Sequence, residues 1–302
     1  MSIDADTLVD RRRLKQRLAW WQAFAVIALV AAVIAAVGRF EALVKPAHVA
    51  RLAVSGLIID DFDRDQALTG VAEDSSAKAL IVRVDSPGGS VVGGEVLYRR
   101  LRAVAEKKPV VAVLSELATS AAYMTAIGAD YIVAHDGTLT GSIGVILQTA
   151  DLTGLLDKLG VKPETVKSSP LKAQPNPLET FTPEAHVAIR AVVADVYAMF
   201  VAMVQERRQM SRDEVMAVAD GRIFTGRQAK DNRLIDALGG EREARIWLAH
   251  AHDISEGLPV RDVDLEGPEN KLQRAFTHMA GKALFPETLS IDGLVSVWHP
   301  GQ

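Results

Sequence analysis

Three short turns rich in serine and glycine hold the residues best suited to acyl-transfer chemistry. Each follows a predicted strand, and they read DSPGGS (85–90), LATSAAYM (117–124) and TGSIGV (140–145). In the first turn, the backbone N–H groups of Gly88 and Gly89 could stabilise an oxyanion. In the second, Ser120 lies where a strand meets a helix, and a helix N-terminus offers unpaired N–H groups and a positive dipole end. The pattern predicts a serine that attacks a carbonyl carbon.

Each turn also has an ordinary structural interpretation. A Gly-Gly pair after a strand is most often a simple turn, and a serine at the start of a helix is most often an N-cap. Ser142, in a Gly-Ser turn, has the same ordinary interpretation. The occurrence of all three turns in this order on one fold is what favours chemistry.

Alternating strands and helices position these turns. Strands are expected at 49–58, 79–85, 109–115 and 130–134, and helices at 63–77, 94–107 and 119–129. The run ALIVRVD (79–85) is nearly continuously apolar, which is typical of strands covered on both faces. The alternation predicts an α/β fold built from right-handed βαβ units with a mostly parallel sheet. Ligands bind at the carboxyl edge of such sheets, which is where the three turns should lie.

The pattern changes after Asp151. A short helix is expected at 152–160 and a strand near 163–168, followed by a segment, 168–183, with four prolines. Prolines forbid a helix interior or a central strand, and long irregular loops within compact domains are usually functional or disordered. A long helix, 184–209, should follow with Thr182 as its cap. Further helices are expected at 211–220, 226–231, 240–252 and 268–283.

The N-terminal region predicts a membrane anchor. Residues 11–17 read RRRLKQR, and residues 19–38 contain no charged side chain. Twenty residues in a helix span about 30 Å, the hydrocarbon thickness of a bilayer, and basic residues stay on the cytoplasmic side. A cleaved signal peptide is the alternative, although its apolar region is usually only about 7–15 residues long.

The expected organisation therefore has five parts. They are a cytoplasmic N-terminus (1–18), a transmembrane anchor (19–38), a linker (39–47), a catalytic domain (48–265) and a C-terminal helical tail (266–302). The N-terminus would lie in the cytoplasm and the catalytic domain outside it.

Composition excludes several classes of function. Of the 302 residues, 49% are hydrophobic and 24% charged, which is typical of a globular protein. The net charge of −4 provides no basic field for nucleic acid, so no nucleic-acid partner is expected. The absence of cysteine excludes disulfides, cysteine nucleophiles and thiolate metal sites. We expect neither a cofactor nor a metal.

Residues 48–249 resemble the signal peptide peptidase A family (serine peptidase family S49), which is related to Clp protease and the crotonases. Five ordered motifs carry the resemblance: DSPGG (85–89), ATSAAYM (118–124), TGSIGV (140–145), VKSSPLKA (166–173) and GRIFTGRQAKDNRLIDALGG (221–240). The chain departs from the family in two places. Ala121 and Ala122 replace the Gly-Gly that usually follows the nucleophile, and Asn232 stands where glycine is common.

The resemblance implies a fold and a set of catalytic roles. The fold would be a crotonase/Clp-protease-like βαβ superhelical core with a C-terminal helical part. Ser120 would be the nucleophile, and Lys172, rather than Lys167, the general base. Ser142 would orient the lysine. The N–H of Gly88 or Gly89, with that of Ser120 or Ala121, would hold the oxyanion. The lysine must be neutral, a form that burial in an apolar cleft favours.

The resemblance also implies a setting. In this family the serine and lysine motifs lie in one protomer or are split between neighbours, and relatives form homo-oligomeric rings. The substrates would be apolar peptides such as cleaved signal peptides, degraded at the extracytoplasmic face of a bacterial inner membrane.

Three alternatives stay open. A histidine-based triad would draw on one of the histidines after residue 48, but no G-x-S-x-G motif is present and none of them lies in a family motif. They are His135, His186, His250, His252, His278 and His299. A crotonase-like enzyme would use the same turns on an acyl-CoA thioester. A catalytically inactive membrane scaffold would explain the replacement by Ala121 and Ala122.

Overall fold

The computed structural model describes residues 17–18, 20–30 and 46–265. The chain divides into two compact units, 1–48 and 49–302, which are considered separately. In the first, an apolar helix, Trp20–Val30, has exposed side chains. Most of the predicted N-terminal segment 1–18 and linker 39–47, and the rest of the anchor 19–38, lie outside the described residues. The same holds for the tail 266–302, with its predicted helix 268–283.

The second unit is built on a mostly parallel sheet. Its strands are β1 (His48–Ile58), β2 (Ala77–Gly89), β3 (Val110–Thr119), β4 (Tyr131–Ala134), β5 (Leu139–Gly141), β6 (Ile223–Thr225), β7 (Ala237–Leu238) and β8 (Val260–Asp262). The strand order is β6-β5-β3-β2-β1-β8, and β4 pairs with β3 and β7. Strands β2 and β3 are parallel, as are β3 and β5, whereas β5 and β6 are antiparallel. The predicted α/β fold class is confirmed.

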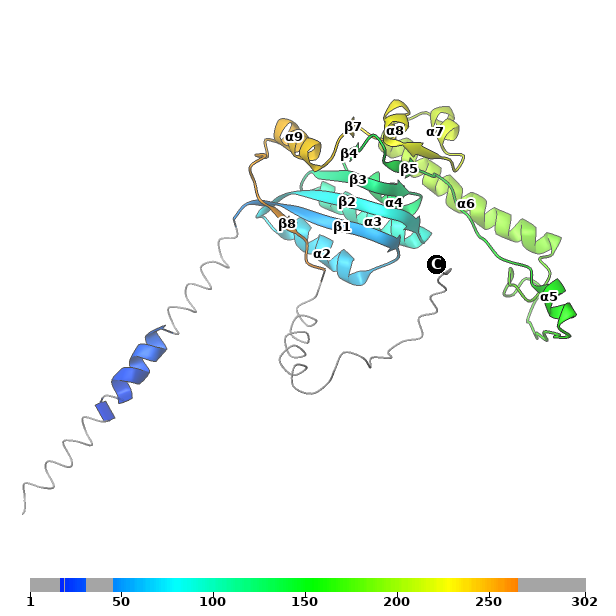
Figure 1. The fold of residues 1–302 in the computed structure, drawn as a ribbon, viewed down its shortest axis with the longest axis horizontal. Coiled ribbons are helices and arrows are strands. Elements are labelled where there is room, and N and C mark those ends of the chain that lie inside the picture. The colour runs from blue at the N-terminus through cyan, green and yellow to red at the C-terminus, as the bar shows by residue number, and fades with distance from the viewer. Residues whose placement is uncertain (1–16, 19, 31–45, 266–302) are drawn as a thin grey trace, which may run out of the picture. The chain divides into compact units, whose positions relative to one another are not determined.

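Helices cover both faces of this sheet (Figure 1). On one side lie α2 (Phe62–Glu73), α3 (Val91–Ala105) and α4 (Ala121–Ala126), and on the other lies α9 (Glu241–His252). The predicted C-terminal helical part is also present. It comprises α6 (Pro183–Arg208), α7 (Arg212–Val218) and α8 (Gly226–Asp231), and a short helix, α5 (Thr153–Lys158), precedes it.

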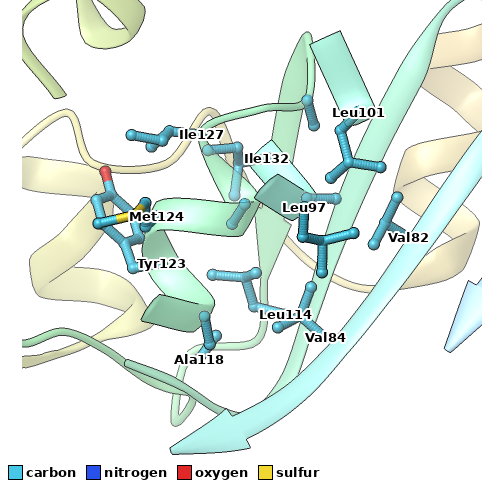
Figure 2. Close-up of a cluster of buried hydrophobic side chains, with 14 of the residues drawn as sticks. Val82, Val84, Leu97, Leu101, Leu114, Ala118, Tyr123, Met124, Ile127 and Ile132 are labelled. Atoms are coloured by element: carbon cyan, nitrogen blue, oxygen red, sulfur yellow. The ribbon is translucent and has the colours of Figure 1, made fainter. Parts of the chain in front are cut away.

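Alternating side chains of the central strands supply the two layers of core. Leu80 and Val82 of β2 belong to the larger cluster, which also holds buried side chains of α3 and α4, whereas Ile81 packs in the smaller cluster with Leu248 of α9. Because helices cover both faces of the sheet, side chains of both registers are buried, and residues 79–82 of β2 are continuously apolar. Figure 2 shows the larger cluster, in which Tyr123 of α4 lies among aliphatic side chains. The buried face of α4 fixes the helix that directly follows Ser120.

Helix α6 belongs to this globular unit along its second half. It is the helix among the described residues that is long and apolar enough to cross a membrane. Its side chains Phe200, Val201 and Val204 are nevertheless buried in the core, whereas Val187 and Val192 are exposed. Thr182 caps the helix as predicted, by accepting a hydrogen bond from the Ala185 N–H.

The strand predicted near 163–168 is wrong. These residues form no regular structure, and 161–166 are exposed. A strand needs a neighbour to pair with its backbone, and no other strand pairs with this segment in the described part of the chain. The local sequence VKPETV (161–166) does not show which strands are within reach, and only the tertiary structure decides that.

Candidate active site

Ser120 has a backbone conformation that is rare for a residue with a side chain. It stands between β3 and α4 with φ 56° and ψ −123°. Ser90, Thr182 and Ser211 also precede helices, but each has an extended backbone and caps its helix. Ser120 makes no such capping bond. Its hydroxyl is therefore not used as an N-cap, and strained conformations of this kind are typical of functional sites.

Two neighbouring strand ends hold Ser120 in place. Its N–H donates to the carbonyl of Gly141 at the end of β5, at 2.9 Å. Gly88, at the end of β2, has φ +112°, and a Cβ there would lie 3.0 Å from both Ser120 Cβ and Thr119 O. A Cβ at position 88 would crowd Ser120 and strain the backbone. The three turns of the sequence thus meet at one edge of the sheet, as predicted.

The candidate oxyanion donors differ in their hydrogen bonding. The Gly88 N–H donates to the buried Ser86 Oγ at 3.0 Å, and the Ser86 hydroxyl donates to Gly56 O at 2.6 Å. The Ser120 N–H is bonded to Gly141 O. Ala121 is the first residue of α4, and its N–H has no hydrogen bond within the described residues. Gly89 packs against β1, since a Cβ there would lie 1.9 Å from Ile58 O.

The fold accommodates the two alanines that follow Ser120. Ala121 and Ala122 are buried in α4, and neither has a positive φ. A Cβ on Gly94 of α3 would lie 2.9 Å from Ala121 Cβ, so this glycine leaves room for the alanine methyl group. Asn232, the other departure from the family pattern, has φ −85° and needs no left-handed conformation. Neither departure from the family pattern therefore requires a backbone conformation that alanine or asparagine disfavours.

Ser120 and Ser142 line one cavity of about 700 Å³. Ser142 also has a positive φ, 50°, and its N–H donates to Arg222 O at 2.9 Å. The wall comes from the turns after β2, β3 and β5, from α6 and from the segment after α7. It consists of Pro87, Ser120, Ser142, Ile143, Gly144, Val145, Ile146, Arg190, Val193, Ala194, Tyr197, Ala219, Asp220 and Gly221.

Most of the cavity wall is apolar, with two charged side chains, Arg190 and Asp220. The Arg222 side chain donates to both oxygens of Asp220, at 2.7 and 2.8 Å, and holds the pKa of that carboxyl below its usual value. Tyr197 Oη donates to Ala219 O at 2.6 Å and joins α6 to the opposite wall. These residues belong to none of the motifs singled out in the sequence, although the spacing of 190, 193, 194 and 197 marks one face of a helix.

Lys172 is not part of this cavity. Its side chain is exposed and has no hydrogen bond or ion pair in the part of the chain that the structure describes. Its segment joins α5 to α6, and Figure 1 shows α5 beyond the end of α6, away from the sheet. Lys167 is instead paired with Glu179. The structure thus brings together Ser120, Ser142 and the glycine turn, but not the predicted base.

No described histidine lines the cavity either. The ring of His135 lies against Gly240, and the ring of His186 packs on Phe181 with a centroid distance of 3.7 Å. His278 and His299 lie outside the described residues. In the described ranges, no cluster of three or more histidine and acidic side chains could hold a metal ion.

The comparisons with known proteins point to peptidases. The family model "Peptidase family S49" matches residues 102–255. "Putative protease slr0021" of Synechocystis is 40% identical over 203 residues, covering 67% of this chain and 73% of that protein. "Putative signal peptide peptidase SppA" of Enterococcus faecium is 33% identical, covering 70% and 66%. A solved membrane-bound stomatin-specific protease aligns with a TM-score of 0.47 and 16% identity, covering 73% of this chain and 99% of that one.

Proposed function

Since the chain belongs to peptidase family S49, we propose that it is a serine endopeptidase in which Ser120 is the nucleophile and Lys172 the general base. The observation that carries the nucleophile is the strained backbone of Ser120 at the wall of a large apolar cavity, with its hydroxyl not used as a helix cap. The role of Lys172 rests on the VKSSPLKA motif (166–173).

The reaction would follow the usual two steps of acyl transfer. Ser120 Oγ attacks the peptide carbonyl while its proton passes to the neutral amine of Lys172. The oxyanion accepts hydrogen bonds from the Ala121 N–H and from that of Gly89, or of Gly88 once Ser86 releases it. Lys172 then protonates the leaving amine, and the C–N bond breaks. Water, deprotonated by the same lysine, hydrolyses the ester and restores Ser120.

The base would come from a neighbouring copy of the chain. Lys172 is exposed on a segment that lies apart from its own cavity, and that cavity contains no lysine. In a closed ring with head-to-tail contacts, each copy presents one surface to the next. Docking into an apolar cavity would remove the ammonium from water and favour the neutral amine. Ser142, on the same wall as Ser120, would accept a hydrogen bond from the lysine.

Apolar peptides are the proposed substrates. Ile143, Val145, Ile146 and Val193 provide an aliphatic wall beside Ser120. Cleaved signal peptides have the required apolar character, and one relative is named for that activity. The apolar segment 19–38 would anchor the enzyme in a bacterial inner membrane, with the N-terminus in the cytoplasm and the catalytic unit outside.

Hydrolysis of a fluorogenic apolar peptide by the full chain in detergent tests this proposal. The wild type should cleave the peptide and react with a fluorophosphonate probe. Ser120→Ala and Lys172→Ala should each lose hydrolysis while keeping the wild-type circular dichroism. Activity that survives Ser120→Ala would refute the nucleophile, and activity that survives Lys172→Ala would refute the base.

A further inference from the structure

The segment that carries Lys172 is closed by an ion pair at its base. Lys167 Nζ contacts Glu179 Oε2, and the two side chains are only 13% and 28% exposed. The hydrogen bond from Lys167 holds the pKa of the Glu179 carboxyl below its usual value, so this carboxyl is ionised at neutral pH. Lys172 lies between these two residues in sequence. The pair therefore joins the two ends of an irregular loop, residues 167–179.

A third side chain ties the middle of the loop to the same carboxylate. Gln174 Nε2 donates to Glu179 Oε2 at 2.7 Å, two residues after Lys172. The other amide atom, Gln174 Oε1, is buried without a hydrogen-bond partner in the described part of the chain. The Gln174 side chain thus lies inside the loop, and its Oε1 could still accept a hydrogen bond.

The backbone of the loop forms turns around Lys172. Its N–H donates to Ser169 O at 3.1 Å, and the Gln174 N–H donates to Leu171 O at 3.3 Å. Asn176 Nδ2 donates to Ala173 O at 3.0 Å, and Ala173 has a positive φ of 61°. These bonds are local and shape the tip. They do not fix the tip relative to the rest of the fold. That task falls to the base of the loop and to the Leu152 N–H, which donates to Pro177 O at 3.0 Å.

The pair differs from a solvent-exposed ion pair, which contributes only about 0–1 kcal/mol to stability, because both of its side chains are largely covered. Pro170, Pro175 and Pro177 prevent the loop from forming a helix or pairing as a strand. Its order must come from turns and side-chain contacts, because fixing the backbone of one residue costs about 1–2 kcal/mol of conformational entropy. Lys167 and Gln174 both bond the Glu179 carboxylate and so join the parts of the loop, and Asn176 and Thr165 interact with the same carboxylate.

We infer that Lys167, Glu179 and Gln174 are positioning residues that hold the loop in the one conformation that presents Lys172 to the nucleophile. This inference rests on the proposed function, in which Lys172 is the general base. The three residues touch neither substrate nor the reacting atoms. They act through the placement of Lys172, and a base displaced by about 1 Å can reduce a rate by about 100-fold.

The test compares steady-state kinetics of the full chain in detergent. Lys167→Met and Glu179→Gln should each lower kcat by about 10–100-fold, with KM within about twofold of the wild type, because a misplaced base slows chemistry rather than binding. The charge-reversed double variant Lys167→Glu/Glu179→Lys should recover much of kcat, since the Gln174 amide can turn its oxygen toward the new ammonium. Arg99→Gln, which removes the exposed ion pair with Glu95, is the matched control and should leave kcat unchanged.

Each outcome decides the inference. Unchanged kcat in Lys167→Met and Glu179→Gln, with Lys172→Ala inactive, would overturn it and leave the proposed function standing. A rise in KM with kcat unchanged would assign the pair to substrate binding and would also overturn it. Activity in Lys172→Ala would instead refute the proposed base. Should Lys167→Met fold poorly, Gln174→Leu provides the same test and should lower kcat without changing KM.

Discussion

Mixing two inactive variants should restore activity if the base comes from a neighbouring copy. Ser120→Ala retains Lys172, and Lys172→Ala retains Ser120. In the structure, Lys172 is exposed and absent from the cavity that Ser120 lines. A site formed between two copies can therefore combine the intact serine of one with the intact lysine of the next. A site formed within one chain cannot, because every chain in the mixture lacks one of the two residues.

The size of the effect follows from counting sites. When the two variants assemble at random in equal amounts, half of the sites contain an intact serine, and half of those face an intact lysine. About a quarter of wild-type activity is then expected for a ring with head-to-tail contacts. The single variants should remain at background, so the gain is easy to measure.

Co-expression with two different affinity tags and purification over both resins yields the mixed assemblies. Peptide hydrolysis gives the activity, and a fluorophosphonate probe should label only the chain that carries Lys172→Ala, because that chain retains Ser120. The control is Lys172→Ala co-expressed with the Ser120→Ala/Lys172→Ala double variant. No chain in this mixture carries Lys172, so it should stay inactive. Mixed assemblies as inactive as this control, under conditions in which the wild type cleaves the peptide, would refute a base shared between copies.

Three further predictions follow from individual contacts. Gly88→Ala should lower both kcat/KM and the unfolding free energy, the latter by about 1–3 kcal/mol. Residue 88 has a positive φ, and the new Cβ would lie 3.0 Å from Ser120 Cβ. Gly70 of α2 has open space around it, so Gly70→Ala should leave the unfolding free energy unchanged or raise it. An equal loss of unfolding free energy in the two variants would show that the contact with Ser120 is not the cause. Lys108→Met should cost about 2–4 kcal/mol in denaturant unfolding, because the Lys108 ammonium donates to the carbonyls of Val71, Asp74 and Ala77 at 2.6–2.9 Å. Its exposed neighbour provides the control, and Lys107→Met should change little. The hydrogen bond from the Ser211 N–H holds the pKa of Glu214 below its ordinary value of 4.5. The ionised carboxyl therefore stabilises the folded state above the ordinary pKa. This stabilisation is lost as the pH falls through the lower pKa of the folded state. The melting temperature of Glu214→Gln should therefore lie below that of the wild type near neutral pH and match it in acid, and a difference that persists in acid would contradict this assignment.

The sequence alone predicted the features that depend on neighbouring residues. Hydrophobic periodicity and caps gave the order of strands and helices, because these signals act over a few residues. The Thr182 cap is an example. The meeting of Ser120 with the turns at Gly88 and Gly141 also followed from the sequence, since the carboxyl ends of parallel strands share one edge.

Tertiary contacts decided the rest. The strained φ of Ser120 depends on Gly88 and Gly141, which approach it from other strands. The Gly88 N–H donates to Ser86 Oγ, so it is not free to bind an oxyanion in this conformation. A strand is expected near 163–168, but no strand of the described ranges pairs with this segment.

The location of Lys172 is the clearest case. The motif VKSSPLKA (166–173) makes Lys172 the proposed base, but the Pro-rich segment has no periodicity from which its path could be predicted. That path is set by Lys167, Gln174 and Glu179, whose contacts form only when the chain has folded back on itself. Local preferences fix which elements form, whereas the distance between a nucleophile and its base depends on contacts between segments that are remote in the chain.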